Sequence, residues 1–295
     1  MIAAASGQDN GFGDALGDAA RAIIADARQT LADTTIPDAQ AVHDLRKAFK
    51  RWRALLRLLA RPLGEQADLM RGEARDLMRS LAQARDVQAA LDALADLRKT
   101  EIAFSPTSME TISTRLTQIK EMAETATVTP QMRTRLNGYL DYATLALDRW
   151  LLQEIGFATV AEGLTDTYRR ARQLVPDQWP SATPGDLHNL RRRVVEHRHQ
   201  LELIAPLWPR LAEVWANEAQ RLRNRLGACQ DLAVFTNLTA PHQPLAHWRS
   251  RLAPLIAARK AAHAAAAARL AARLFAEKPK AFHRRIEGLW KARGE

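Results

Sequence analysis

Apolar residues along the chain recur at intervals of three and four positions, the spacing that places them on one face of a helix. Alternating runs of Val, Ile or Thr between Asn-Gly or Asp-Gly turns, which are typical of strands, are nearly absent. The pattern therefore predicts an all-α protein. Long helices are expected over about 14–32, 37–60, 65–99, 106–154, 155–174, 183–206, 209–237 and 245–277, with a short helix from Phe282 to the end.

Capping residues and prolines mark where some of these helices begin or break. Thr183-Pro184-Gly185-Asp186 predicts a helix start, with a Thr cap, proline at the first position and an acidic residue in the first turn. Thr129-Pro130 predicts a break within 106–154. Residues 1–13 precede the first helix and are expected to be flexible.

The chain contains an internal repeat at a constant offset of 145 residues. Between 42–91 and 187–236, thirteen of fifty positions are identical without a gap. The identical pairs include polar and charged residues: His43/His188, Arg46/Arg191, Arg53/Arg198, Glu73/Glu218 and Asp86/Asp231. Two leucine-rich helices can match at apolar positions by chance, but matching polar residues are harder to explain in that way. We expect a single domain over 14–290, made of two four-helix bundles, 14–154 and 155–290, related by an approximate two-fold axis.

The first copy of the repeat predicts a helix with one apolar face and one cationic face. Leu45, Phe49 and Trp52 belong to the apolar, core-facing stripe. Basic side chains at i, i+3, i+4, i+7, i+10 and i+14 form the cationic stripe: His43, Arg46, Lys47, Lys50, Arg53 and Arg57. Like charges at such spacings cost an isolated helix roughly a few tenths of a kcal/mol per pair. The stripe therefore indicates a site that an anion neutralises, with a solvent-facing charge run as the alternative.

The second copy repeats this stripe only in part, at His188, Arg191, Arg192 and Arg198. Val195 and Glu196 stand where the first copy has basic residues, so the second half should present fewer cations at the far end of its helix. The helix that follows the first stripe adds Arg75 and Arg79 to the expected site. In the second half, the arginines within 221–225 fall on shifted faces and are not assigned to it.

The composition supports an anionic partner. The chain has 295 residues, with 43 Lys and Arg against 33 Asp and Glu, a formal net charge of +10. Nucleic acid, polyphosphate and an anionic membrane all fit such an excess, as does a solvated basic surface without a partner. The single cysteine, Cys229, excludes an intramolecular disulfide and fits a reducing, cytoplasmic compartment. The N-terminus lacks the basic region of a signal peptide, and no run of about 18 apolar residues predicts a membrane span.

The residue types in the stripes suit phosphate groups. Arg offers a planar fork that matches phosphate oxygens, Lys supplies a mobile point charge, and His adds a donor that becomes cationic near neutral pH. A phosphate chain without bases needs only a line of cations. Single-stranded nucleic acid is usually bound with aromatic stacking platforms, whereas Phe49 and Trp52 lie on the core stripe.

The two stripe helices resemble the signature helices of the CHAD family, the conserved histidine α-helical domain. The resemblance rests on VHDLRKAFKRWRALLRL and LHNLRRRVVEHRHQLEL, on their doubled His-x-Leu-Arg-Lys/Arg motif, and on LAQARD and LGACQD at matching distances. It covers about 14–290. It implies two four-helix bundles around a pseudo-two-fold axis, a central basic channel that binds inorganic polyphosphate, and recruitment to polyphosphate bodies. The matching residues are His43, Arg46, Lys47, Lys50 and Arg53 in one half and His188, Arg191, Arg192 and Arg198 in the other.

Other functions find less support in the residues. Some relatives fuse this domain to a triphosphate-hydrolysing domain with an E-x-E-x-K motif, but no Glu here is followed by another two residues later. Walker, H-E-x-x-H and G-x-S-x-G motifs are also absent, so we expect neither enzyme activity nor a cofactor. The histidines do not cluster with carboxylates, so no metal site is expected. A membrane partner is not expected, because the aliphatic residues of the basic helices belong to a core stripe. RNA or another nucleic acid remains the alternative partner.

Overall fold

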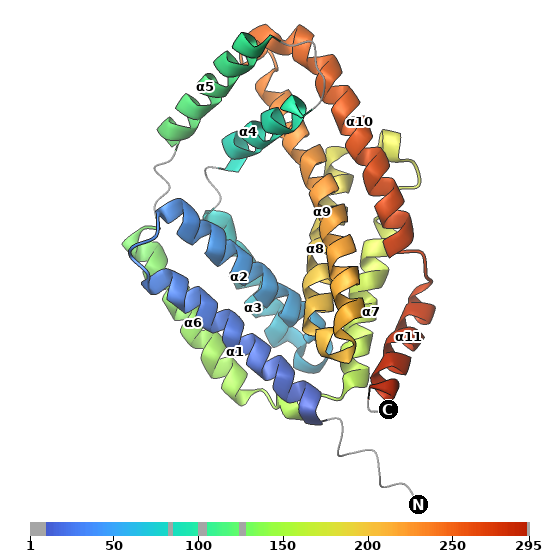
Figure 1. Ribbon diagram of the computed structural model, residues 1–295. Helices are drawn as coiled ribbons and strands as arrows, with labels where there is room; N and C mark the ends of the chain where they lie inside the picture. Colours follow the sequence, from blue (N-terminus) through green and yellow to red (C-terminus); the bar gives the residue numbers. More distant parts are fainter. Residues whose placement is uncertain (1–9, 82–84, 100–104, 124–127, 294–295) are drawn as a thin grey trace, which may run out of the picture.

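The computed structural model describes residues 10–81, 85–99, 105–123 and 128–293. These residues form helices and no strand, so the all-α prediction is confirmed (Figure 1). The α-helices are α1 (Asn10–Ala32), α2 (Asp38–Leu58), α3 (Ala60–Ser80), α4 (Arg85–Arg98), α5 (Pro106–Ala123), α6 (Pro130–Arg149), α7 (Phe157–Gln173), α8 (Pro184–Leu203), α9 (Pro209–Leu238), α10 (Arg249–Leu274) and α11 (Pro279–Ala292). The short 3-10 helices are η1 (Leu152–Glu154), η2 (Trp179–Ser181), η3 (Ala205–Leu207) and η4 (Ala246–Trp248). None of the described helices has the length and apolar character that crossing a membrane requires.

The expected helix starts at Thr129-Pro130 and at Thr183-Pro184 are confirmed. Thr129 caps α6 by accepting a hydrogen bond from the Met132 N–H at 3.2 Å. Thr183 caps α8, and the Asp186 carboxylate accepts a hydrogen bond from the Thr183 N–H, which completes a capping box. Of the N-terminal segment expected to be flexible, 1–9 lie outside the described residues, and 10–13 form the first turn of α1.

The single helix expected over 65–99 is wrong. The chain leaves the helical conformation at Leu81, where φ is −88° and ψ is 11°, and α4 begins at Arg85. Residues 82–84 lie outside the described part of the chain. The break lets α4 depart from the line of α3 and pack against α9 (Figure 1). The matching stretch of the second half continues unbroken as α9, so the two halves differ here.

The break expected at 61–64 is confirmed at Gly64, whose backbone is not helical, although α3 as a whole begins at Ala60 and continues past this kink. Gly64 has a φ of 59°, in the left-handed region that side chains with a Cβ rarely adopt. The bend therefore depends on glycine.

Two hydrophobic cores hold the helices together. The larger contains buried residues of α1, α2, α3, α6, α7, α8 and α11, with the first part of α9 and the end of α10. The smaller contains buried residues of α4 and α5, the end of α9 and the start of α10, with Phe235 and Leu252 fully buried. Both cores take residues from both sequence halves, so shared apolar surfaces hold the halves together.

The order of the helices follows the sequence repeat. α7, α8, α10 and α11 begin about 145 residues after α1, α2, α5 and α6, and α9 covers the stretch that corresponds to α3 and α4. Their neighbours correspond as well, because α1 packs on α2 and α6 while α7 packs on α8 and α11. The two stripe helices, α2 and α8, pack directly against each other.

Candidate functional site

Three polar bonds inside the core hold α2 in place. The Trp52 indole donates a hydrogen bond to the Tyr139 hydroxyl at 2.8 Å, and that hydroxyl donates to the Met70 carbonyl at 2.9 Å. From the other side, the Gln200 amide donates to the Ala54 carbonyl at 3.1 Å. These bonds connect α2 directly to α6 and α8, and through Tyr139 to α3. They fix the direction in which the cationic side chains of α2 point.

Two adjoining hollows lie where α2 faces α8 and α9. The first, about 380 Å³ in volume, lies between α2, α3, α8 and α9, and we call it the basic hollow. It is lined by Arg46, Lys50, Arg53, Arg75, Met78, Arg79, His188, Arg191, Arg192, Val195, Glu196 and Arg223. The second, about 440 Å³ in volume, lies between α2, α4, α8 and α9, and we call it the mixed hollow. It is lined by His43, Arg46, Lys50, Gln88, Ala89, Asp92, Ala93, Asp96, Arg191, Arg223, Asn224, Gly227, Ala228 and Asp231.

The lining of the basic hollow is strongly positive. Eight guanidinium or ammonium groups share it with one carboxylate, that of Glu196. Glu196 is buried and accepts a hydrogen bond at 2.7 Å from Arg193, which does not line the hollow. Its charge is therefore already engaged, and the residues that line the hollow carry a surplus of positive charge.

The mixed hollow continues the basic hollow toward α4. Four basic residues line both and so join them: Arg46, Lys50, Arg191 and Arg223. Its other end, on α4 and α9, carries three carboxylates: Asp92, Asp96 and Asp231. The basic and mixed hollows together form what we call the groove. The surplus of cations over carboxylates therefore falls from the α3 end of the groove to the α4 end.

Two α2 arginines in this region lie partly out of water. For Arg53, burial is the largest cause of a lowered pKa, and Arg192 adds to it while Glu196 opposes it. For Arg57, burial and the neighbouring Arg71 lower the pKa to about 10. The Nε atoms of Arg53 and Arg57 are buried and have no hydrogen-bond partner among the described residues. Both groups remain charged at neutral pH, so each would be stabilised by an anion that reached it.

The α3 arginines of the basic hollow have only weak partners. Arg75 and Arg79 both contact the Asp76 carboxylate, at 3.0 Å and 3.4 Å. All three side chains are about half exposed or more, so these ion pairs contribute little to stability. A phosphate group can therefore compete with Asp76 for them at small cost.

Gln230 orients two predicted residues of α8. Its side-chain oxygen accepts a hydrogen bond from Arg191 at 3.0 Å and lies 3.2 Å from His188 Nδ1. Because this oxygen can only accept, Nδ1 carries the proton. Within the described ranges, no group of three or more His, Cys, Asp and Glu residues is placed to hold a metal ion.

The structure brings nine of the twelve predicted residues together along the two hollows. They are His43, Arg46, Lys50, Arg53, Arg75, Arg79, His188, Arg191 and Arg192. The other three, Lys47, Arg57 and Arg198, line neither hollow.

Each of these three residues lies outside the two hollows for a different reason. Lys47 is turned by about 100° from Arg46 around the helix axis, and it lines another hollow together with residues of α1. Arg198 donates a hydrogen bond to Glu202 at 2.7 Å. Arg57 lies further along α2, in a cluster with Arg71. The cationic site on α2 is therefore narrower than the spacing alone predicts.

Arg223 lines both hollows, although the sequence did not assign it to the site. Within 221–225, Arg221 forms an ion pair on the surface and Arg225 contacts α10, so only Arg223 faces the groove. Its counterpart in the repeat is Met78, so the comparison of the two halves carries no signal for it.

A partly buried ion network, which the sequence did not predict, borders the mixed hollow. Arg259 donates two hydrogen bonds to Asp96, at 2.7 Å and 2.8 Å, and His263 Nε2 lies 2.6 Å from the same carboxylate. Burial alone would raise the pKa of Asp96, but these bonds from Arg259 and His263 hold it at about 2. The network ties α4 to α10. Its three positions have no counterparts of the same type in the repeat.

Comparison with known proteins identifies one family. The family model described as CHAD domain matches residues 14–240. No curated protein and no solved structure matches the chain. The matched range includes every residue that lines the basic and mixed hollows, and α10 and α11 follow it.

Proposed function

The chain belongs to the CHAD family, and from that premise we propose that it binds inorganic polyphosphate along the basic hollow. One observation carries the proposal. Four helices direct eight cationic side chains into one hollow whose single carboxylate is already engaged by Arg193.

This lining suits a repeating chain of phosphates. Each arginine can donate two parallel hydrogen bonds to phosphate oxygens, and Lys50 adds a point charge. Binding would release the counterions that otherwise surround both partners, so the affinity should fall steeply with salt.

We also propose that the two halves act as a pair around a pseudo-two-fold axis between α2 and α8. In support, Arg46 and Arg191 are equivalent in the repeat and line both hollows, and α2 packs against α8. A polyphosphate chain has the same structure in both directions. One chain can therefore contact equivalent residues of the two halves in the same way. Val195 and Glu196 make the contribution of α8 weaker than that of α2.

Nucleic acid is the alternative partner, because it carries the same phosphate charges. No Phe, Tyr or Trp side chain is among the residues that line the basic or mixed hollow. Proteins that hold single strands usually stack bases on aromatic rings. The base-free polymer therefore fits this lining better than RNA does.

We propose binding without catalysis. Hydrolysis of a phosphoanhydride needs a group that activates water, and the carboxylate of the basic hollow is committed to Arg193. In the cell, the corresponding expectation is a cytoplasmic protein that gathers on polyphosphate granules.

Calorimetric titration tests the proposal. The purified protein is titrated with long-chain polyphosphate and, separately, with single-stranded RNA at matched phosphate concentration and about 150 mM salt. We expect tight binding of polyphosphate, weak binding of RNA and no release of orthophosphate. RNA binding equal to or stronger than polyphosphate binding would show a general polyanion surface instead.

A further inference from the structure

A third hollow of about 550 Å³ lies apart from the groove, and we call it the outer hollow. It is lined by Arg61 at the start of α3, by α7 side chains within 162–169 and by α11 side chains within 280–284. It shares no lining residue with the basic or mixed hollow. Its volume falls within the roughly 300–1,000 Å³ typical of small-molecule sites.

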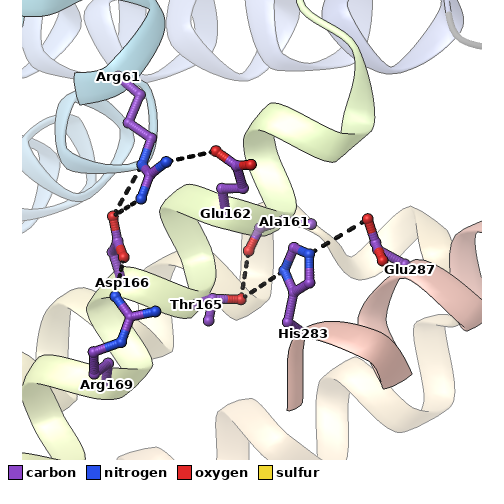
Figure 2. Close-up of polar contacts among 8 residues, drawn as sticks. All are labelled: Arg61, Ala161, Glu162, Thr165, Asp166, Arg169, His283 and Glu287. Carbon is purple, nitrogen blue, oxygen red and sulfur yellow. Dashed lines mark hydrogen bonds and ion pairs between the residues drawn. The ribbon is translucent and has the colours of Figure 1, made fainter. Parts of the chain in front are cut away.

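The α7 wall of the outer hollow is an ion network that is complete in itself. Arg61 contacts Glu162 at 2.6 Å and Asp166 at 2.9 Å, and Arg169 also binds Asp166 (Figure 2). Partial burial opposes ionisation of Asp166, but the hydrogen bonds from Arg61 and Arg169 hold its pKa below the ordinary value. Each carboxylate of this wall is therefore paired with an arginine.

The α11 wall is fixed to α7 through His283. The Thr165 hydroxyl donates its proton to the Ala161 carbonyl at 2.7 Å, so it can only accept from His283 Nδ1, which lies 3.1 Å away (Figure 2). The other ring nitrogen lies 3.4 Å from the Glu287 carboxylate. The Nδ1–Thr165 hydrogen bond holds this face of α11 against α7.

Two cations on the α11 wall are uncommitted. Lys280 and Arg284 both line the outer hollow, one helical turn apart, and neither has a hydrogen-bond or ion-pair partner within the described ranges. Arg285 next to them is held by Glu277 at 2.7 Å. Like charges at this spacing destabilise a helix unless an anion lies between them. The positive end of the α11 dipole adds to the attraction.

We propose that the outer hollow binds a compact phosphate compound, whose phosphate oxygens contact Lys280 and Arg284. A dianionic phosphate group matches two cations, and the arginine fork fits its geometry. The hollow, about 550 Å³ in volume, suits a compact ligand, and the carboxylates opposite can accept hydrogen bonds from hydroxyl groups of a phosphate ester. The site does not follow from the CHAD match, because Lys280 and Arg284 lie beyond residue 240.

Calorimetric titration of the full chain tests the proposed phosphate site with three probes: orthophosphate, pyrophosphate and glucose 6-phosphate. We expect saturable one-to-one binding of at least one probe, and the strongest of the three identifies the source of the phosphate group. Lys280→Gln with Arg284→Gln should weaken that binding by at least about tenfold, because two charge-assisted contacts are lost. Lys278→Gln with Lys291→Gln removes the same charge at the two ends of α11, outside the hollow, and should change the affinity less than about twofold.

Two variants distinguish phosphate binding in the outer hollow from polyphosphate binding in the groove. Lys50→Gln with Arg192→Gln should leave binding of the small probe unchanged, and the Lys280/Arg284 variant should still bind polyphosphate. The proposal is overturned if no probe saturates, if both α11 variants lose the same affinity, or if the groove variant abolishes binding of the probe.

Discussion

His197 is a titratable side chain enclosed by an aromatic cluster. Its ring contacts Tyr168, Phe275 and Phe282, and only 1% of the residue is exposed. Its Nδ1 has no hydrogen-bond partner among the described residues. Burial lowers the pKa of His197 to about 3, so the side chain is neutral in the folded protein at physiological pH.

This burial predicts a loss of stability in mild acid. The pKa in the folded protein lies below that of the unfolded chain, so unfolding takes up a proton once the pH falls below about 6.5. Stability is therefore fully present above that pH and declines as the pH falls toward 3. Between pH 7.5 and pH 5.0, urea unfolding should show a loss of about 2 kcal/mol from this residue.

His197→Leu should remove most of that pH dependence without lowering stability at pH 7.5, since no hydrogen bond of Nδ1 is lost. His199 on the same helix also has a pKa lowered by burial, so a smaller slope should remain. The exposed His247 supplies the control, because His247→Gln should keep the slope of the wild type. Identical slopes in wild type and His197→Leu would show that His197 does not cause the effect.

Lys47 and Lys50 show that helical spacing alone does not predict which basic side chain lines the groove. Both satisfied the spacing of the cationic stripe, yet Lys50 lines the groove and Lys47 lines another hollow beside α1. A periodic pattern locates a face of a helix but not the packing of its neighbours. Arg223 was missed for the same reason, because only the position of α9 against α2 makes it face the groove.

Helix α4 owes its position to contacts from the second half of the chain. It packs on α9 and, through Asp96, binds Arg259 and His263 of α10. The periodicity and the capping signals were sufficient to predict most helices and the break before α6. They could not predict the break between α3 and α4, because α4 is held by residues that are distant in sequence.

The α4–α10 link predicts a selective loss of stability. Asp96→Asn should lower the free energy of unfolding by about 2 to 3 kcal/mol, because Arg259 would keep its charge without its carboxylate partner. Asp92→Asn, on the same helix and in the same hollow, should change it by less than about 0.5 kcal/mol, because Asp92 is exposed and bonded only by Gln88 within the described ranges. Urea unfolding of both variants at pH 7 measures the difference, and equal midpoints would contradict a structural role for the Asp96 network.

At the scale of the whole molecule, cationic side chains from both sequence halves meet in one hollow. The net charge is +10, and one hollow between α2, α3, α8 and α9 collects eight cations against one carboxylate. The sequence predicted the sign of the charge, the two stripe helices and most of the lining. It did not predict the fall in positive charge toward α4, because the carboxylates there come from separate helices that meet only in the fold.

The most direct test asks whether polyphosphate recognises this hollow or only the net charge. Lys50→Gln with Arg192→Gln and Lys47→Gln with Arg198→Gln each lower the net charge from +10 to +8 on the same two helices. The first pair lies in the basic hollow and the second does not. Both variants are first checked for wild-type helicity by circular dichroism.

Polyphosphate affinity is then measured for both variants over a range of salt concentrations. We predict that the Lys50/Arg192 variant loses at least about tenfold in affinity, because two charge-assisted contacts are removed. The slope of log K against log salt should become shallower by about 1.4, since each lost phosphate contact removes about 0.7. The Lys47/Arg198 variant should match the wild type in both. Equal losses in the two variants would show that polyphosphate responds to net charge alone and would contradict binding in the basic hollow.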